Sequence, residues 1–485
     1  MTAVGSEISA SHVSTNRPTR HARVLDLFRD PLRTFVVLAV LAGGYLAFTV
    51  PSLGGIDEKA HFYRSYQIST GHLVPERTDR AGFSGACIPV DVIVQVERDK
   101  AVYYRHLLDL AGSKAVAPKP PRRSEVLRCP GDTSDGLVTF STFGSPVPYA
   151  PQVMAILVTR SLGLSVNGML LAGRLAMLMG YIVVVAFAIR RSPRAKWALC
   201  ATALLPVAVF QSASSVSHDA ITTAVALFVL SSALRAVDPP DGVTPRQLLV
   251  EALLASTVLG LCKPVYVVVA FCYLLPLLGS RRRPESRLLA IAPLLGVIVS
   301  LAWNQIVGDL WKTDAGYFGI RPDPSHQKHE LITAPWHFAA DALRTLFEQV
   351  TDWVRTLVEV GPSVTHWPWI LAVVMLLVFV GVSIQRDQAE PACLHVRQRL
   401  LLLAVLSVGV VMIIAANYVY WTDPGSSTVG GVQPRYFMPL VALLPVAIGP
   451  VHFGKLRLRA TRIPLALALV PALVVFLVSA SFRMH

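Results

Sequence analysis

Long apolar runs separated by polar segments dominate the chain. The first run, residues 34–53, has about the length of a helix that crosses the roughly 30 Å of bilayer hydrocarbon. Later apolar segments cover residues 148–164, 166–189, 197–212, 219–236, 247–262, 265–279, 287–306, 368–385, 399–420, 436–453 and 463–481. This pattern predicts an all-α integral membrane protein.

Basic residues between the apolar runs indicate how the chain crosses the membrane, because Lys and Arg gather on the cytoplasmic side. If residues 148–164 crossed, the basic cluster at 190–196 and every later cluster would lie outside. If that segment lies in the interface or re-enters, the clusters near 235–246, 281–283, 386–399 and 455–462 all fall inside. Prolines at 146, 148 and 151 fit such a broken segment. We therefore predict about eleven transmembrane helices, with the N-terminus cytoplasmic and the C-terminus outside.

This topology divides the chain into a tail and one membrane domain. Residues 1–33 are polar and arginine-rich and predict a disordered cytoplasmic tail, and residues 34–485 form the transmembrane domain. Two long insertions fall outside the membrane: 54–165, with interfacial helices, and 307–367. In the second insertion, apolar residues at helical spacing within 339–360 predict an amphipathic interfacial helix.

Composition agrees with a membrane protein and argues against a nucleic-acid partner. The chain has 485 residues, of which 53% are hydrophobic and only 15% are charged, against about 25% in soluble domains. Its net charge of +14 comes from short basic clusters scattered between apolar runs. That distribution serves membrane orientation and forms no continuous basic face.

The stretch GGIDEKAHFYR at 54–64 follows the first run directly and carries the densest set of chemical groups. If Asp57 starts a helix, His61 and Arg64 follow at i+4 and i+7 on the same face. The aromatic residues Phe62, Tyr63 and Tyr66 would then lie at headgroup depth. The alternative is a solvated first turn, in which Asp57 and Glu58 only complement the helix dipole.

Further polar groups fall at the outer ends of the predicted spans. They are His218, Asp219, Lys263, Tyr266, Gln433, Arg435 and Tyr436, while Arg174 lies within a span. Each has a structural alternative: Lys263 and Arg435 bind lipid headgroups, Asp219 caps a helix, and Arg174 pairs with a carboxylate or holds a helix end. Their convergence on one side of the membrane favours a shared site.

Two of the six cysteines, Cys87 and Cys129, lie in an outside loop. We predict a disulfide between them, which would constrain a long segment rich in proline and glycine. The sequence has neither zinc-ligand spacing nor a nucleotide-binding glycine loop. A requirement for Mg or Mn stays open, with Asp57 and Asp219 as the ligands if a metal binds.

These groups suit transfer of a sugar from a polyprenyl phosphate, whose phosphate leaves as a stable anion without a general acid. The reaction needs a carboxylate to deprotonate the acceptor hydroxyl and cations to hold the phosphate. Asp57 is the candidate base, assisted by Glu58 or Asp219, and Arg435 and Lys263 are candidate phosphate ligands. His61 and His218 would orient the carboxylates or bind sugar hydroxyls.

Four segments resemble recurring motifs of the DUF2142 family of bacterial polytopic membrane proteins. They are DEKAHFYRSYQISTG at 57–71, SSVSHD at 214–219, KPVY at 263–266 and GVQPRYF at 431–437. The resemblance covers roughly residues 35–450. One departure is Pro434, where a small residue is usual before Arg435.

The family is similar to the GT-C glycosyltransferases, and the resemblance implies a large first outer loop with Asp57 or Glu58 as the essential acid. It also implies an inverting hexosyl or pentosyl transfer from a polyprenyl-phosphate donor to a glycan, lipid or protein of the cell envelope, outside a bacterial cytoplasmic membrane. The alternatives are a transporter or flippase of a polyprenyl-linked glycan and a non-enzymatic envelope scaffold. A transporter would carry ionisable groups near the bilayer midplane.

Overall fold

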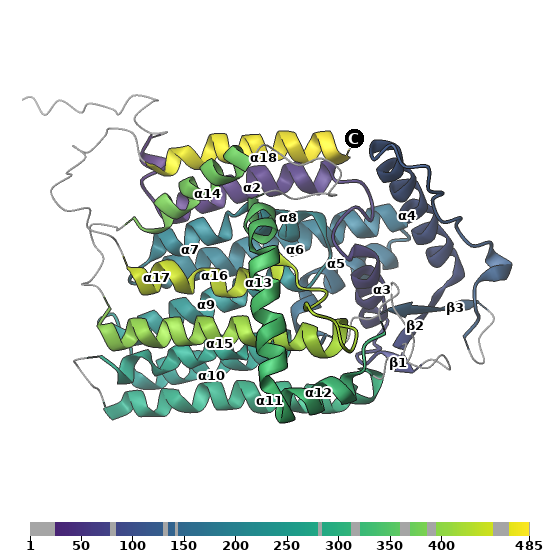
Figure 1. Cartoon of the computed structure of the whole chain (residues 1–485). Coiled ribbons are helices and arrows are strands. Elements are labelled where there is room, and N and C mark those ends of the chain that lie inside the picture. Colours follow the sequence, from purple (N-terminus) through teal and green to yellow (C-terminus); the bar gives the residue numbers. More distant parts are fainter. Residues whose placement is uncertain are drawn as a thin grey trace, which may run out of the picture.

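The chain folds into a helical bundle with one small sheet (Figure 1). The computed structural model describes residues 25–77, 84–129, 134–140, 144–279, 284–311, 321–358, 369–385, 394–449 and 465–484. The predicted tail up to residue 24 and the basic clusters at 281–283 and 455–462 lie outside these ranges.

Six described helices are long and apolar enough to cross a bilayer. They are α2 (Pro31–Thr49), α6 (Val166–Arg191), α9 (Asp219–Val237), α10 (Pro245–Cys262), α11 (Ile291–Val307) together with the end of η4 (Pro284–Ala290), and α15 (Val396–Trp421). The pair α7 (Lys196–Ala203) and α8 (Pro206–Ser214), bent by 58° at its break, makes a seventh if it is one span. The chain is therefore an α-helical membrane protein with six or seven candidate spans.

Four shorter apolar helical segments account for the other predicted spans. They are η3 (Pro264–Leu277), α14 (Trp369–Ser383), the run of η6 (Pro434–Phe437), α16 (Met438–Val441) and α17 (Leu443–Ile448), and the run of η7 (Leu465–Ala468) and α18 (Leu469–Met484). Each of the eleven predicted segments thus contains apolar helix, but the count of eleven spans stays a prediction.

The apolar segment at 148–164 forms the short turn η2 (Val147–Tyr149) and the helix α5 (Ala150–Ser161). With 12 residues, α5 is roughly 18 Å long, well short of the hydrocarbon thickness. Prolines at its start break the helix from the chain before it. This geometry agrees with a segment that does not span.

The long apolar helices run roughly parallel to one another (Figure 1). Most of the first insertion, including α3 (Glu58–Ser69) and α4 (Val90–Leu110), gathers at one end of the bundle, which we call the polar end. The C-terminal end of α18 also lies there, whereas α2 begins at the opposite end.

The first insertion is held together by a three-stranded antiparallel sheet of order β1-β2-β3. Its strands are β1 (Glu76–Arg77), β2 (Ser84–Pro89) and β3 (Asp135–Phe140), and a short turn η1 (Arg123–Glu125) precedes β3. Cys87 in β2 and Cys129 before β3, the pair expected from the sequence, are joined by a disulfide.

The aromatic rings of α3 face the protein and not the membrane surface, contrary to the prediction of a helix that lies on that surface. Phe62, Tyr63 and Tyr66 are buried in a cluster with residues of β2, α4 and α5. The sheet and α4 therefore cover the face of α3 that the sequence pattern assigned to the membrane surface. These apolar partners come from distant segments of the chain, which local periodicity does not reveal.

The second insertion contains η5 (Gly308–Trp311), α12 (Pro324–Thr333) and α13 (Pro335–Val358). The amphipathic helix predicted within 339–360 corresponds to α13, which runs across the long helices of the bundle (Figure 1). One face packs Phe338 on Tyr418 and Trp353 on Phe437, while Trp336 and Phe347 remain exposed.

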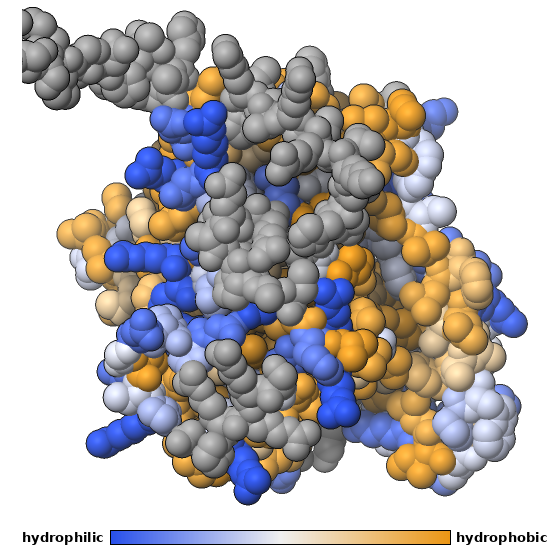
Figure 2. Space-filling model, turned by 90° about the vertical axis from the view of Figure 1, so that its left-hand side faces the viewer, coloured by the Kyte–Doolittle hydropathy of each residue, from blue (hydrophilic) through white to orange (hydrophobic). Residues whose placement is uncertain are grey.

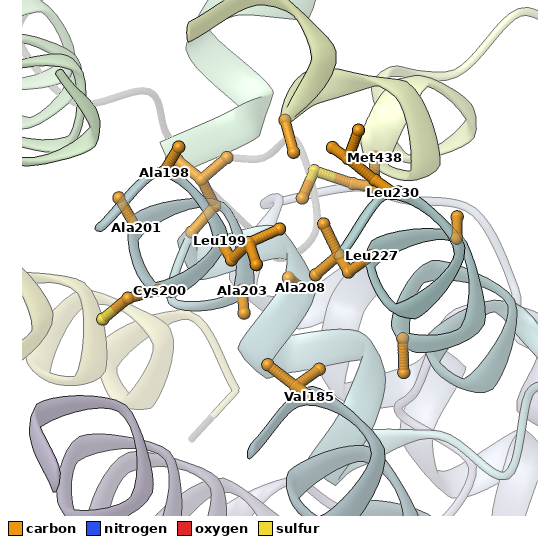
Figure 3. Packing of buried hydrophobic residues seen from close by; sticks show 14 of the residues in the cluster. Val185, Ala198, Leu199, Cys200, Ala201, Ala203, Ala208, Leu227, Leu230 and Met438 are labelled. Atoms are coloured by element: carbon orange, nitrogen blue, oxygen red, sulfur yellow. The ribbon is translucent and has the colours of Figure 1, made fainter. Parts of the chain in front are cut away.

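The bundle interior is built from small and branched apolar side chains (Figure 3). Ala198, Ala201, Ala203 and Ala208 on α7 and α8 are all buried, and small residues of this kind allow helices to approach closely within lipid. Leu227 and Leu230 of α9 pack in the same cluster beside Met438 of α16. This packing fixes α9, which begins at Asp219, and α16, which directly follows Arg435 in η6.

Candidate active site

A tight turn after α2 positions Asp57. A Cβ added at Gly55 would lie only 2.0 Å from the carbonyl oxygen of Ser214, so this close approach of two backbones requires glycine. Ser215 Oγ donates to the carbonyl of Ile56 over 3.1 Å. Asp57 itself precedes α3 with φ 54°, in the left-handed region that few non-glycine residues adopt. The turn between α2 and α3 is therefore docked on the 214–217 loop.

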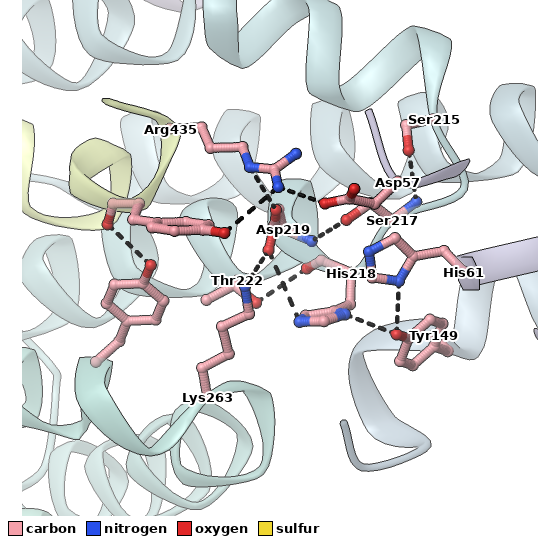
Figure 4. Close-up of polar contacts among 12 residues, drawn as sticks. Asp57, His61, Tyr149, Ser215, Ser217, His218, Asp219, Thr222, Lys263 and Arg435 are labelled. Carbon is pink, nitrogen blue, oxygen red and sulfur yellow. Dashed lines mark hydrogen bonds and ion pairs between the residues drawn. The ribbon is translucent and has the colours of Figure 1, made fainter. Parts of the chain in front are cut away.

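Four charged residues from four helix ends meet at this turn (Figure 4). Arg435 of η6 donates through Nη2 to Asp57, and its Nε lies 3.9 Å from the Oδ2 atom of Asp219, the first residue of α9. Lys263, between α10 and η3, donates through Nζ to Oδ1 of Asp219. Two carboxylates and two cations therefore form one connected cluster.

A tyrosine joins two histidines on the other side of this cluster (Figure 4). The Tyr149 hydroxyl lies 2.8 Å from Nδ1 of His61 and 2.8 Å from Nδ1 of His218. Because the hydroxyl has a single proton, it donates to one imidazole and accepts from the other. His218 Nε2 is buried without a hydrogen-bond partner among the described residues and lies 3.7 Å from Oδ1 of Asp219.

Burial keeps both imidazoles neutral near pH 7. Desolvation, opposed by the carboxylates of Asp219 and Asp57, lowers the pKa of His61 to about 4. Desolvation also holds the pKa of His218 well below its usual value, and the charge of Lys263 acts in the same direction. Desolvation raises the pKa of Asp57, but the charge and hydrogen bond of Arg435 together with the nearby His61 outweigh it, so the pKa of this carboxyl lies below its usual value.

Asp57 is the carboxylate of the cluster that is most open to solvent. Its side chain is 56% exposed, while the Arg435 side chain that it contacts is 5% exposed. Arg435 Nε is buried and has no hydrogen-bond partner among the described residues. The site therefore combines an accessible base with a cation that retains an unused donor.

Aromatic side chains fix the turn that carries Arg435. The Tyr266 hydroxyl donates to the carbonyl of Tyr436 over 2.8 Å. The Tyr436 ring centroid lies 5.4 Å from Lys263 Nζ and 5.2 Å from Arg435 Cζ, within cation–π range of both. Pro434, which departs from the family pattern, is the first residue of η6, a position that suits its fixed φ. Gln433 precedes it, and its carbonyl accepts a bond from the Tyr436 amide.

Glu58 and Arg64, both predicted from the sequence to act at this site, lie elsewhere. Glu58 is fully buried and forms two 2.7 Å bonds to Arg174 Nε and Nη2, so the intramembrane Arg174 pairs with a carboxylate. Arg64 donates to Gln67 and to the backbone carbonyls of Leu73 and Gly144. Asp57 stands before the helix rather than within it, so the predicted common face with Arg64 does not form.

Tyr149 was not predicted from the sequence. It belongs to the proline-rich start of the 148–164 segment, which the apolar pattern marks only as an irregular membrane entry. A tyrosine between Pro148 and Ala150 gives no signal of its own. Its role depends on α5 packing against α3, which brings His61 within reach.

Both carboxylates that the sequence offered as metal ligands are paired with cations of the protein. Asp57 and Asp219 each face a cation. Across the described ranges, no three His, Cys, Asp or Glu side chains are grouped so as to hold a metal ion.

Comparison with known proteins identifies a family. No curated protein and no solved structure matches the chain. A family model described as a predicted membrane protein, DUF2142, matches residues 40–444, which include every residue of the cluster described above. The chain therefore belongs to the DUF2142 family of predicted membrane proteins.

Proposed function

We propose that this protein is a GT-C-like membrane glycosyltransferase that moves a sugar from a polyprenyl phosphate to an acceptor hydroxyl of the cell envelope. The observation that carries the proposal is the half-exposed carboxylate of Asp57 beside the cations Arg435 and Lys263. This transfer needs only a base and a pair of cations that bind the phosphate. No general acid is required, because the phosphate leaves as a stable anion.

The two cations would hold the departing phosphate. Arg435 offers a planar fork with one unused donor, and Lys263 offers a partly exposed ammonium. A phosphate bound at this pair competes with Asp57 and Asp219 for the same N–H groups. Losing the Arg435 contact raises the basicity of Asp57, since the charge and the hydrogen bond of that guanidinium both lower the pKa of this carboxyl. Donor binding therefore activates the base.

The reaction is a single displacement. The acceptor oxygen attacks the anomeric carbon, the bond from that carbon to the phosphate oxygen breaks, and Asp57 takes the acceptor proton. The products are the glycosylated acceptor, with inverted configuration, and polyprenyl phosphate. His61 and His218 are neutral and tied to Tyr149, so we assign them to orienting sugar hydroxyls and Asp219 rather than to proton transfer.

We place the N-terminus in the cytoplasm and the site on the extracytoplasmic face of a bacterial cytoplasmic membrane. The basic residues Arg190, Arg191, Arg235 and Arg246 lie at helix ends opposite the cluster, which supports this orientation. Envelope glycans, lipids or proteins on the outer face would then supply the acceptor.

A transporter or flippase of a polyprenyl-linked glycan is the alternative. Intramembrane charges that drive transport gather near the bilayer midplane. Here Asp57 precedes α3, Asp219 is the first residue of α9, and Lys263 directly follows α10. Their position at helix ends favours chemistry at a membrane surface.

The test is sugar transfer in membranes that contain the protein and a panel of radiolabelled polyprenyl-phosphate hexoses and pentoses. Asp57→Asn should lower transfer by about 10²–10⁴-fold, the usual contribution of a general base. Asp109→Asn, at an exposed position of α4, is the matched control and should keep full activity. Full transfer by Asp57→Asn would refute its role as base. Mass spectrometry of envelope glycans and lipids from a deletion strain would identify the missing sugar.

A further inference from the structure

A large apolar groove lies away from the candidate site, between α2, α6, α9 and α10. It has a volume of about 1320 Å³, above the roughly 300–1,000 Å³ of most small-ligand pockets. Its walls include Val183, Phe187, Phe228, Val250 and Leu254. Val183 is 57% exposed and Leu254 is 63% exposed, so these walls face the surroundings of the bundle rather than its core.

The groove is distant from the Asp57 cluster along the helices that line it. Asp219 is the first residue of α9, and Arg235, which also lines the groove, follows 16 positions later. At 1.5 Å per residue this separation is roughly 24 Å, close to the thickness of the bilayer hydrocarbon. The basic mouth of the groove therefore lies near the membrane surface opposite the candidate site.

Four arginines and two carboxylates surround this mouth. The lining includes Arg190, Arg191, Arg235, Arg246, Asp241 and Glu251. Glu251 accepts from Arg191 over 2.6 Å and from Arg235 over 2.8 Å. Arg191 is further fixed over the Phe187 ring, at 4.8 Å from its centroid. The arginines outnumber the carboxylates by two, so the mouth keeps an excess positive charge.

Arg190 and Arg246 differ from the other two arginines because both are exposed and neither forms an ion pair with a described residue. Figure 2 views the end of the bundle where these helix ends lie and shows hydrophilic side chains gathered among hydrophobic ones. Basic residues at a membrane surface attract anionic headgroups. An apolar groove below two guanidinium groups suits a lipid with an anionic headgroup, because the groove accepts the acyl chains and the guanidinium groups attract the headgroup.

We propose that this groove binds an anionic phospholipid of the leaflet opposite the candidate site. Its phosphate lies between Arg190 and Arg246, and its acyl chains cover the apolar walls on α6, α9 and α10. We choose a phospholipid over a polyprenyl phosphate because bulk phospholipids already surround any apolar surface within a bilayer. Occupancy then needs only the charge preference that the arginines supply.

The lipid would bridge α6 and α10, since Arg190 ends the first helix and Arg246 begins the second. Glu251 already ties α10 to α6 and α9 through its two arginine partners. A phosphate bound between Arg190 and Arg246 would add a second link between α6 and α10, at the membrane surface. The site is independent of the glycosyl-transfer proposal, because it shares no residue with the Asp57 cluster.

Native mass spectrometry of the full-length protein can test the site directly. The purified protein is mixed with phosphatidylglycerol or phosphatidylcholine of identical acyl chains, and retained lipid is counted at matched collision energy. We expect about fivefold more retained phosphatidylglycerol, since about 1 kcal/mol of charge preference corresponds to this ratio. The double variant Arg190→Gln with Arg246→Gln should retain the two lipids equally.

Arg397→Gln is the matched control. Arg397 is exposed near the start of α15, outside the groove lining, so this variant removes one surface charge without touching the groove. It should keep the preference for phosphatidylglycerol. Val183→Trp narrows the groove while leaving its arginines in place, and should reduce retention of both lipids.

Three outcomes would overturn the proposal. The first is equal retention of the two lipids by the unmodified protein. The second is a loss of preference in Arg397→Gln as large as that in the double variant. The third is displacement of bound phosphatidylglycerol by polyprenyl phosphate at a concentration below that of the phosphatidylglycerol. Size-exclusion elution and thermal melting of each variant in one detergent show whether it is folded. If the double variant does not fold, competition by soluble glycerol phosphate against phosphatidylglycerol decides whether the headgroup is recognised.

Discussion

Asp57 and Glu58 are neighbours in the sequence, yet their carboxylates have opposite surroundings. Glu58 is fully buried, receives two 2.7 Å bonds from Arg174, and accepts a third from the amide of Gly55. Arg174 in turn donates to the carbonyls of Val50 and Pro51 at the end of α2. Asp57 is 56% exposed and meets Arg435, whose Nε has no partner among the described residues.

The difference separates a structural ion pair from the one that we propose to be functional. The Glu58–Arg174 pair has its donors and acceptors used within the protein, and it fastens α6 to the turn that carries Asp57. The Asp57–Arg435 pair keeps a half-exposed carboxylate, which a substrate could engage, and an unused Nε donor that is buried beside it. Unsatisfied charge at an accessible position therefore marks the site, and satisfied charge at a buried position marks its support.

The largest expected effect comes from breaking the structural pair. Glu58→Gln leaves the Arg174 guanidinium buried without its counter-charge, which typically costs about 3–5 kcal/mol. We expect a sharp fall in the amount of folded protein and in its thermal midpoint in detergent. Asp57→Asn, one residue away, should lower the thermal midpoint less, because Arg435 keeps Asp219 at 3.9 Å as a counter-charge and asparagine tolerates the left-handed φ of this position. Similar melting of the two variants would contradict the assignment of Glu58 to structure and Asp57 to chemistry.

Matched arginine substitutions sharpen the comparison further. Arg435→Lys keeps a charge but loses the fork that holds a phosphate, and should lower sugar transfer by about 10²–10³-fold with little change in stability. Arg174→Lys loses the bidentate contact to Glu58 and bonds to α2 carbonyls, so it should lower stability instead. Transfer rates and melting curves of both variants are measured in the same membranes. Lower stability in Arg435→Lys and lower transfer without loss of stability in Arg174→Lys would mean that the two roles are misassigned.

The sequence predicts the apolar helices of this protein better than it predicts the surroundings of single side chains. Hydrophobic runs locate each apolar helix, because lipid forces the helical pattern into local sequence. The convergence of Asp57, Asp219, Lys263 and Arg435 follows from placing helix ends on one membrane side. The roles of Glu58 and Tyr149 depend on distant partners that the sequence does not show. Glu58 meets Arg174, and Tyr149 meets the two histidines.

A third prediction concerns pH. The pKa of His61 is lowered to about 4 by burial, whereas an unfolded chain would hold this histidine near its ordinary value of about 6.5. Between these values the unfolded state binds more protons, so stability falls as pH decreases from about 6.5 toward 4. For His61 alone the loss at pH 5 is about 2 kcal/mol.

Thermal melting between pH 7.5 and 5 measures this loss. His61→Asn, which keeps a hydrogen-bonding group for Tyr149 but cannot be protonated, should reduce the pH dependence, and the slope that remains is the part that His218 contributes. Glu58→Gln removes the buried ion pair with Arg174 but keeps His61, so it is the comparison variant that lowers stability without removing this imidazole. An unchanged slope in His61→Asn would mean that the imidazole is not buried in its neutral form.

The smallest expected effect comes from Tyr149, whose hydroxyl joins the two histidines that face the exposed pair. Tyr149→Phe keeps the ring but leaves Nδ1 of His61 and of His218 without this partner, at a cost of about 1–3 kcal/mol. Tyr45→Phe is the control, because it removes a more exposed hydroxyl that bonds Ser481 and should cost much less. We expect Tyr149→Phe to lower the rate of transfer at saturating donor more than it changes donor binding, because the histidines orient groups rather than hold the phosphate. A loss confined to donor affinity would instead mean that Tyr149 supports Arg435 and Lys263, and that the histidines belong to the phosphate site.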